Sequence, residues 1–430
     1  MTVQTPRIPG EPALRWESRA STIAGIEHEL ARIWSEPKLT TEIEGVEARH
    51  VAARTSVMNL VVIARRPEVA EHCATLIRGL MGRLPSRTII CTSADPDRPS
   101  WLDARVTAQC VLPRADAPET CAETIFITAG GETGRHLDAI VEPLLIHDLP
   151  VAIWWPGEPP LSGEQARDLL DSADLLIVDG SSWSDDGVGR LLELAALAAT
   201  TRVTVADFAQ VRQSRWREAI ASTFDVPEFL PYLRSLRRIA VTYATHVEPG
   251  RPGSTNLVKP LYHVAWLASR LGFDVARPLT PLGVRGGPAG HSAAAGSESG
   301  AAGRPASARA RTAGVATTGR GYGATLRDGT SEVAVLLRPV VSTMPAGTTL
   351  RVELLAERRG SELRVDVTAE AETVMVRVWQ DGVEVLDRRF GAPRRTEMDL
   401  LAEAIESGGR DRISDQAVAM AAKLAAGLAG

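Results

Sequence analysis

The first apolar pattern of the chain has the period of a helix. Apolar residues recur at three- and four-residue steps at Ile23, Ile26, Leu30, Ile33 and Trp34. This spacing predicts an amphipathic helix over residues 18–34, and the proline at position 37 closes it.

Short apolar or alternating runs follow, bounded by proline, glycine and aspartate. They cover residues 57–64, 88–92, 105–112 and 124–128 and predict strands. Residues 67–84, between the first two runs, have helical spacing and a proline in the first turn. The order strand, helix, strand is therefore expected at this point.

The same alternation continues downstream. Helices are predicted near residues 135–146, 164–172, 188–199, 214–224 and 258–271, and strands at residues 150–154, 175–178 and 202–206. Alternation of this kind is typical of an α/β fold, a mainly parallel sheet flanked by helices. We expect this sheet to extend to about residue 274.

Composition changes sharply after this region. Residues 276–321 are rich in Gly, Ala, Ser, Pro and Arg and contain almost no large apolar side chain, which predicts a flexible linker. Six strand-like runs separated by turns then predict a strand-rich antiparallel C-terminal part, completed by terminal helices near residues 397–407 and 416–428.

The length of 430 residues exceeds that of one ordinary domain. We divide the chain into an N-terminal helix (1–45), an N-terminal α/β domain (46–180), a continuation of the α/β region (181–275), the linker (276–321) and the C-terminal part (322–430).

Charge and cysteine content exclude several classes of protein. The net charge is −5 and both signs are interspersed, so nucleic acid is not an expected partner. No stretch of about 18 apolar residues could span a bilayer, so a membrane is not expected either. The N-terminus lacks the apolar core of a signal peptide, which favours the cytoplasm. Cys73, Cys91, Cys110 and Cys121 form neither a CxxC motif nor the close pairs of a zinc site. We expect them to be buried free thiols.

One glycine-rich turn could hold a ligand. Gly130, Gly131 and Gly134 lie between a predicted strand and a predicted helix, where backbone amides could receive a phosphate. The spacing is not GxGxxG, and no Gly-Lys-Ser/Thr follows. A tight turn that needs a positive φ explains the same glycines. No HExxH or GxSxG motif occurs, so no metal ion, cofactor or catalytic residue is expected.

Two aromatic sites remain. Trp154 and Trp155 end a predicted strand at the edge where α/β sheets place their sites, and we expect one to pack inward and the other to approach the rim. Arg212, Trp216 and Arg217 are expected to lie on one helix face, as in an interface anchor. Ordinary core packing is the alternative for the tryptophans.

Six strings of the chain, taken together and in order, resemble one family. They are RTSVMNLVVIAR, LPSRTII, VEPLLIHDLPVAIWWPG, LLIVDGSSW, ADF with RWREAIASTFD, and HVAWLASRLGF, between residues 54 and 273. They are similar to the OpcA family, the glucose-6-phosphate dehydrogenase assembly proteins of actinobacteria, cyanobacteria and related bacteria.

The family pattern carries over at many positions of this chain. They are Asn59, Leu60, Ser86, Arg87, residues 143–145 and 148–150, Trp154, Trp155, Asp179, Asp207, Arg212, Trp216, Arg217, Phe224 and Asp225. The chain departs from the pattern after Asp207, where Phe208, Ala209 and Gln210 replace Leu-Asn-Trp, and at Arg215, which replaces a proline. An aromatic contact of the family is therefore expected to be lost or moved.

The resemblance implies a non-catalytic protein that binds glucose-6-phosphate dehydrogenase and promotes its assembly or active form. Trp154, Trp155, Arg212, Trp216 and Arg217 are the expected partner-binding residues. The alternative is a sugar-phosphate-binding protein or enzyme that uses the turn from Gly130 to Gly134.

Overall fold

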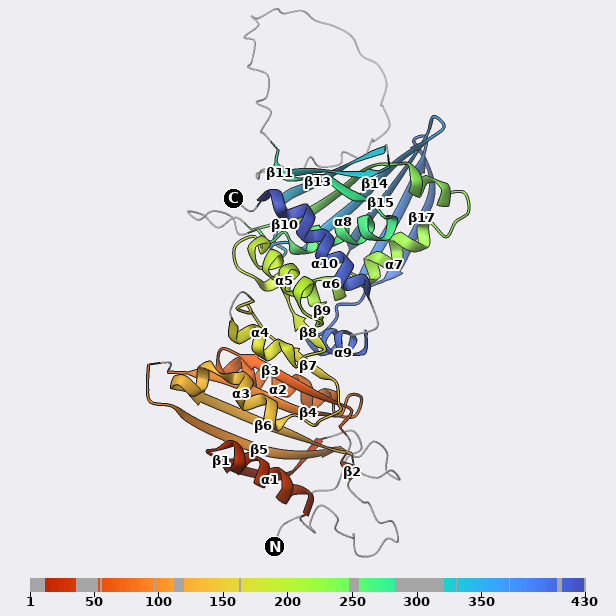
Figure 1. Cartoon of the computed structure of the whole chain (residues 1–430). Coiled ribbons are helices and arrows are strands. Elements are labelled where there is room, and N and C mark those ends of the chain that lie inside the picture. The colour runs from red at the N-terminus through yellow and green to blue at the C-terminus, as the bar shows by residue number, and fades with distance from the viewer. Residues whose placement is uncertain are drawn as a thin grey trace, which may run out of the picture.

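The structure is a computed structural model that describes residues 12–35, 53–54, 56–95, 97–111, 120–161, 164–246, 255–282, 321–329, 331–370, 372–407 and 412–428. Within these ranges the chain forms a nine-stranded sheet at its N-terminal end and an eight-stranded sheet at its C-terminal end (Figure 1). Helices lie between the two sheets and against them. Most of the predicted linker lies outside the described residues.

Six strands of the first sheet run parallel. They are β3 (Met58–Ala64), β4 (Ser86–Ala94), β6 (Thr120–Gly130), β7 (Val151–Trp154), β8 (Leu175–Val178) and β9 (Thr204–Asp207). Across the sheet they follow the order β6-β4-β3-β7-β8-β9. In chain order this is 3-2-1-4-5-6, the arrangement of doubly wound dinucleotide-binding folds. The predicted mainly parallel sheet is confirmed.

Additional strands extend the first sheet beyond β6. Strand β5 (Trp101–Val111) runs antiparallel to β6, β1 (Pro12–Ala20) runs antiparallel to β5, and the two-residue β2 (Ala53–Arg54) pairs with β6. Strand β1 was not predicted, and its last residues had been expected to belong to the first helix.

Helices cover both faces of the first sheet. The side chains of β3 alternate between two buried clusters, one on each face of the sheet. All seven residues of this strand are therefore buried. One cluster contains α2 (Pro67–Leu80) and α9 (Glu397–Ser407). The other contains α1 (Ile23–Ser35), α3 (Leu137–Val141), α4 (Glu164–Asp171) and α5 (Val188–Thr200).

The predicted helix over residues 135–146 is broken in the structure. Two short 3-10 helices, η2 (Gly131–Arg135) and η3 (Glu142–Leu144), flank the five-residue α3. Pro143 lies in η3, where a proline ring is incompatible with a continuing α-helix.

The second sheet begins earlier in the chain than expected. Its strands are β10 (Leu236–Thr245), β11 (Asp274–Pro281), β12 (Tyr322–Asp328), β13 (Ser331–Val341), β14 (Thr349–Arg358), β15 (Ser361–Glu370), β16 (Thr373–Gln380) and β17 (Val383–Gly391). The expectation that the first sheet extends to about residue 274 is wrong. Residues 276–281, assigned to the linker, belong to β11.

Strand β10 interrupts the expected antiparallel meander. It is inserted between β13, to which it is parallel, and β14, to which it is antiparallel. All other pairs of this sheet are antiparallel, so the predicted strand-rich antiparallel C-terminal part is confirmed apart from this insertion.

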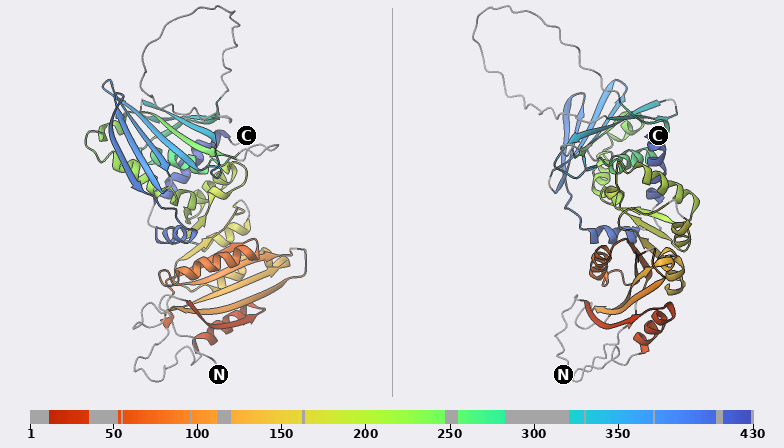
Figure 2. Two further views of the ribbon diagram at one scale, coloured as in Figure 1. Left: turned by 180° about the vertical axis from the view of Figure 1, so that it is seen from behind. Right: turned by 90° about the vertical axis from the view of Figure 1, so that its left-hand side faces the viewer.

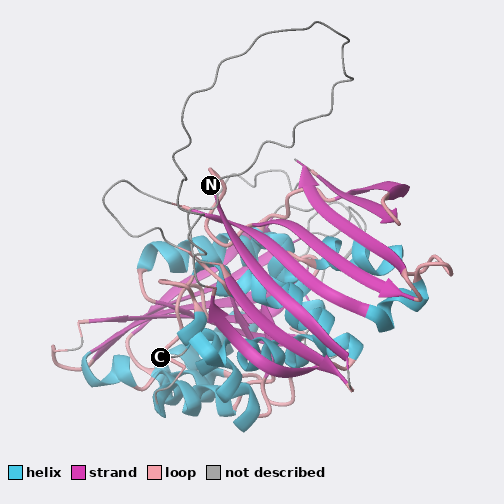
Figure 3. Ribbon diagram, turned by 90° about the horizontal axis from the view of Figure 1, so that it is seen from above, coloured by secondary structure: helices cyan, strands magenta, loops and turns pink. Residues whose placement is uncertain are grey.

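Helices pack on one face of the second sheet. They are α7 (Ser214–Thr223), α8 (Val258–Leu271), which ends at the left-handed Gly272, and α10 (Arg412–Ala425), which η6 (Ala426–Leu428) continues. The strands lie in front of these helices in the view from behind (Figure 2, left). Seen from above, the helices also gather on one side of the strands (Figure 3).

The C-terminal helices join the two sheets. Helix α9 packs against α2 on the first sheet, whereas α10 packs against α5 and α8. At the edge of the first sheet, Asp415 accepts a hydrogen bond from the Val205 N–H, and the Ser414 hydroxyl donates to the Val205 carbonyl. The start of α10 thus satisfies the outer backbone groups of β9.

The cysteines differ from the expectation of four free thiols. Cys110 and Cys121 form a disulfide because β5 and β6 place them directly opposite each other. Sequence spacing could not reveal this pairing, which depends on the register of two antiparallel strands. Cys73 and Cys91 are free and buried, and burial raises the pKa of each thiol to about 12.

Among the described residues, no helix is both long and apolar enough to cross a lipid bilayer.

Candidate functional site

Three neighbouring strands of the first sheet end in polar or aromatic residues. Trp154 ends β7, Asp179 directly follows β8, and Asp207 ends β9. Since the carboxyl ends of parallel strands meet at one edge, these residues form a single site. The N-terminal end of α8 lies over this edge.

Asp207 is the centre of the site. Its carboxylate is fully buried and accepts hydrogen bonds from the Gly180 N–H (2.9 Å), the Ala209 N–H (2.8 Å) and the Tyr262 hydroxyl (2.8 Å). These donors come from η4 (Gly180–Ser182), α6 (Phe208–Val211) and α8. One carboxylate therefore connects the first sheet to a helix that packs on the second.

Asp179 forms the outer half of the site. Arg212 donates from Nη1 and Nη2 to its two carboxylate oxygens at 2.8 and 2.9 Å, and Ser181 donates from its amide and its hydroxyl. The Arg212 side chain is 32% exposed. The charged end of this bidentate pair is therefore partly accessible.

The N-terminal end of α8 and the residues just before it supply further members of the site, which were not predicted from the sequence. Asn256 donates to the Gly180 carbonyl (3.0 Å), and Gln213 donates to the Lys259 carbonyl (2.7 Å). Lys259 is one of only three lysines in the chain. That scarcity and the Lys-Pro step at a helix start were the only sequence signals for it.

Burial and neighbouring charges shift the acidity of these groups. Burial and then the Asp179 carboxylate raise the pKa of Asp207 to about 6. Burial also acts to raise the pKa of Asp179, but the hydrogen bonds and charge of Arg212 outweigh it and lower this pKa. Burial and then Arg212 lower the pKa of Lys259. The site is thus a compact set of coupled charges.

The two strand-end tryptophans are both buried. Trp154 is 1% exposed and packs on Phe208 with 6.2 Å between ring centroids, whereas Trp155 is 7% exposed and lies on the opposite face of the sheet. The expectation that one of them approaches the rim is wrong, because Trp155 packs into the cluster that α4 and α5 cover.

Arg212 and Trp216 do not share a helix. Arg212 follows α6 and points to Asp179, whereas Trp216 lies within α7, is 9% exposed and contacts His263 edge-on at 5.3 Å. Arg217 is half-buried beside them. Burial and then Arg217 lower the pKa of His263 to about 3, so this ring is neutral.

The glycine turn is closely packed. Gly131 has φ of +62°, and its N–H donates to the Asp95 carbonyl. A Cβ atom on Gly130 would meet the Trp101 ring at 2.1 Å, and one on Gly134 would meet the Ala129 carbonyl oxygen at 2.7 Å. Close packing thus accounts for all three glycines and leaves the proposed phosphate site without support from open space.

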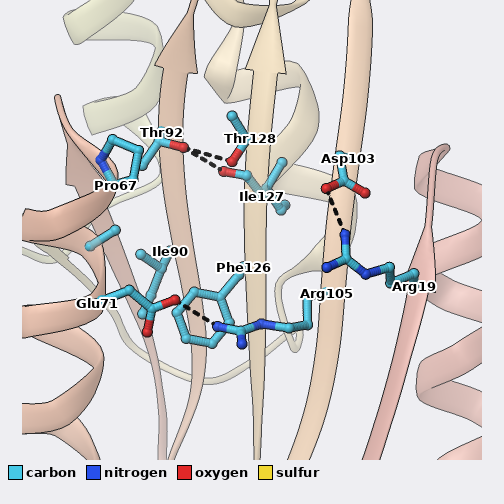
Figure 4. A pocket seen from close by; sticks show the side chains of 11 residues that line it. Arg19, Pro67, Glu71, Ile90, Thr92, Asp103, Arg105, Phe126, Ile127 and Thr128 are labelled. Atoms are coloured by element: carbon cyan, nitrogen blue, oxygen red, sulfur yellow. Dashed lines mark hydrogen bonds and ion pairs between the residues drawn. The ribbon is translucent and has the colours of Figure 1, made fainter.

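A shallow hollow of about 260 Å³ lies elsewhere, on the face of the first sheet beside α2 (Figure 4). Its two arginines are paired: Arg19 with Asp103 at 3.1 Å, and Arg105 with Glu71 at 2.8 Å. Arg105 also lies over the Phe126 ring. These contacts are typical of a solvated sheet face. In the described part of the chain, no cluster of His, Cys, Asp or Glu is arranged to hold a metal ion.

Family models match both halves of the chain. The glucose-6-phosphate dehydrogenase subunit N-terminal domain matches residues 77–196, and the C-terminal domain of the same subunit matches residues 203–418. The chain belongs to the OpcA family. The two matched segments include the whole strand-end site, and the resemblance seen in the six sequence strings is confirmed.

Curated relatives occur in cyanobacteria. Proteins provisionally named OxPP cycle protein OpcA from Synechocystis sp. and Synechococcus elongatus are each 28% identical, over 189 and 192 residues. Each alignment covers 44% of this chain but only 37% and 40% of the respective relative. The chain therefore matches less than half the length of these OpcA relatives.

Solved structures resemble the chain only distantly. The transcriptional regulator Gal80p from Kluyveromyces lactis is 12% identical with a TM-score of 0.40, covering 83% of this chain and 84% of its own. Aldose-aldose oxidoreductase from Caulobacter crescentus is 12% identical with a TM-score of 0.41, covering 86% and 97%. No functional conclusion follows from likenesses at this level.

Proposed function

We propose that this OpcA-family chain is a non-catalytic cytoplasmic partner of glucose-6-phosphate dehydrogenase that promotes the assembly or active form of that enzyme in the oxidative pentose phosphate pathway. Family membership across both matched segments carries the proposal. A partner that binds the active conformation more tightly than the inactive one raises the population of the active enzyme.

The topological switch point of the first sheet supports a non-catalytic role. Dinucleotides bind such sheets between the carboxyl ends of the first and fourth parallel strands, over a glycine-rich turn. In this chain those strands are β3 and β7, and the turn after β3 is Arg65-Arg66. Arg65 donates to the Glu158 carbonyl at 2.9 Å and so bridges the crevice with a protein side chain.

The partner-binding surface that we propose centres on Arg212 and Arg217. Both side chains are partly exposed beside the strand-end site, and arginines with fixed geometry are frequent interface anchors. Trp154 packs on Phe208, over whose ring Arg212 lies, and Trp216 directly precedes Arg217 in α7. In this proposal these two tryptophans hold the arginines in place from within.

The test is affinity for the dehydrogenase of the same organism, measured by calorimetry with Arg212→Ala and Arg217→Ala. Truncation of an anchor typically costs about 2 kcal/mol, or roughly thirtyfold in Kd. Arg270→Ala, an exposed arginine at the far end of α8, is the matched control and should bind normally. Dehydrogenase activity is followed in the same mixtures.

Two outcomes oppose the proposal at different levels. If the wild-type chain neither binds nor activates the dehydrogenase at micromolar concentration, the function is wrong. If it binds and both arginine variants bind equally well, the function stands and the surface is misplaced. Unfolding midpoints of each variant separate lost contacts from lost structure.

A further inference from the structure

A cavity of about 300 Å³, widely open to solvent, lies at the end of the first sheet opposite the strand-end site. Leu30, Ala31 and Trp34 of α1 form one wall, Pro143 and Leu144 of η3 form the other, and Arg87 of β4 lies between them. Arg87 is the second residue of β4, so the cavity is at the amino ends of the parallel strands.

The guanidinium group of Arg87 is only partly used by the fold. Its side chain is 9% exposed, Nε donates to Glu123 at 2.7 Å, and Nη1 donates to the Leu144 carbonyl at 2.9 Å. Within the described residues Nη2 has no hydrogen-bond partner, and it is not one of the unpaired polar atoms that are fully buried. This nitrogen is therefore accessible. Because the rest of Arg87 is buried and the residue lines the cavity, Nη2 is accessible from the cavity.

The walls of the cavity are fixed before any ligand enters. The Asn59 side chain donates to the Ile146 carbonyl (2.9 Å) and accepts from the Ile146 N–H (2.8 Å), which anchors the segment that follows η3. Trp34 donates from its indole N–H to the fully buried Glu123, which anchors α1 against Arg87. A preformed site loses little conformational entropy when it binds.

We infer that this cavity binds a small organic anion, whose carboxylate or phosphate oxygens accept from Arg87 Nη2 and whose apolar body packs on Trp34, Leu30 and Pro143. Mixed apolar walls with one convergent charged donor are the usual composition of a small-molecule site. An arginine donor favours carboxylate or phosphate oxygens.

Residues from two of the six sequence strings meet at this cavity and are not part of the proposed partner surface. Arg87 comes from LPSRTII, and Pro143 and Leu144 come from the first half of VEPLLIHDLPVAIWWPG. The partner surface uses residues at the carboxyl ends of β8 and β9, at the other end of the sheet. A separate ligand site gives these strings a function that packing alone does not require.

Glu27 allows the inference to be tested by an expected gain in anion affinity as well as by an expected loss. Its side chain lies at the rim of the cavity, and no partner in the described part of the chain neutralises it. A carboxylate at the mouth of an anion site weakens binding, so its removal should tighten binding.

The experiment uses ligand-observed NMR and calorimetry on the full chain without the dehydrogenase. The probes are benzoate, phenyl phosphate and the neutral twin benzamide. Probes of about ten heavy atoms should bind with Kd near 1 mM if they are anionic, whereas benzamide should bind at least about tenfold more weakly. Binding of only benzoate, or of only phenyl phosphate, supports the site and identifies the head group.

Variants locate the site. Ala31→Phe fills the mouth of the cavity and should weaken anion binding at least about tenfold, whereas Ala24→Phe, exposed two turns earlier on the same helix, should leave it unchanged. Glu27→Gln should lower Kd about threefold. Arg87→Lys, which keeps a cation for Glu123, should weaken anion binding about tenfold. If Arg87→Lys does not fold, Ala31→Phe still tests whether the anion binds in this cavity.

Absence of anion binding at 10 mM probe (about ten times the expected Kd), or equal binding by wild type and Ala31→Phe, would overturn the inference. Neither result bears on the dehydrogenase, which is absent from the experiment. The partner proposal and the anion site can therefore fail independently.

Discussion

The two sheets use the same ion-pair chemistry in opposite surroundings. In the first, Arg87 and Glu123 pair at 2.7 Å with side chains that are 9% and 0% exposed. In the second, Arg377 and Asp387 pair at 3.4 Å on neighbouring strands with side chains that are 46% and 40% exposed. The sequence contains an arginine and a carboxylate in both cases, but only burial decides how much each pair contributes to stability.

Turn glycines show the same contrast. Gly131, after β6, has φ of +62° and a neighbouring carbonyl 2.4 Å from the position that a Cβ atom would take. Gly360, between β14 and β15, has φ of +80° and no atom within 4 Å of that position. The first region depends on close approach, whereas the hairpins of the second depend on local backbone conformation alone.

The largest effect is expected from Glu123→Ala. This variant leaves Arg87 buried without its carboxylate, which should lower the free energy of unfolding by about 3 to 5 kcal/mol. Urea unfolding at pH 7, followed by tryptophan fluorescence, measures it. The loss should persist in 0.5 M salt because a buried pair is poorly screened. A loss below about 1 kcal/mol would mean that water reaches this pair.

Gly131→Ala should follow, at about 2 to 4 kcal/mol. The substitution combines a left-handed backbone conformation with a Cβ atom placed against the Arg98 carbonyl oxygen. Gly360→Ala is the matched control and should lose only about 1 kcal/mol, because its cost is conformational. Equal losses in the two variants would remove the distinction between the two kinds of turn.

Asp207→Asn should make stability less dependent on pH. Because the pKa of Asp207 is raised to about 6 in the folded chain, ionisation of this carboxyl costs stability as pH rises from about 4 to 6. Relative to wild type, the variant should therefore gain about 2 kcal/mol between pH 4 and pH 7. Asp179, whose pKa is lowered, has the opposite dependence on pH in both proteins. A difference that does not change with pH would show that Asp207 titrates normally.

Periodicity predicted the regular elements well where burial alone determines which residues are apolar. The run Leu175–Val178 is apolar throughout because β8 is buried on both faces, and no competing pattern occurs there. Strand β10 failed for the opposite reason. Its residues, LRRIAVTYAT, mix apolar with charged and polar side chains, and nothing local distinguishes a strand of the first sheet from one inserted into the second.

The residues of the strand-end site were named in the sequence analysis, but their arrangement into one site was not predicted. Asp179, Asp207 and Arg212 were identified through the family pattern, and the structure brings them together. The pairing of Arg212 with Asp179 rather than with Trp216 depends on the break between α6 and α7, which no periodicity marks. Asn256, Lys259 and Tyr262 were missed because α8 reaches the site only through tertiary packing.

The smallest effect is expected at the exposed pair of the second sheet. A double-mutant cycle with Arg377→Ala and Asp387→Ala should give a coupling energy below about 1 kcal/mol, since two solvated side chains lose entropy when they pair and gain little Coulomb energy. In 0.5 M salt the coupling should approach zero, because charges in contact with solvent are screened. A coupling above about 2 kcal/mol that survives high salt would contradict the comparison: it would mean that this face of the second sheet is covered in solution and that its ion pairs are as buried as Arg87 and Glu123.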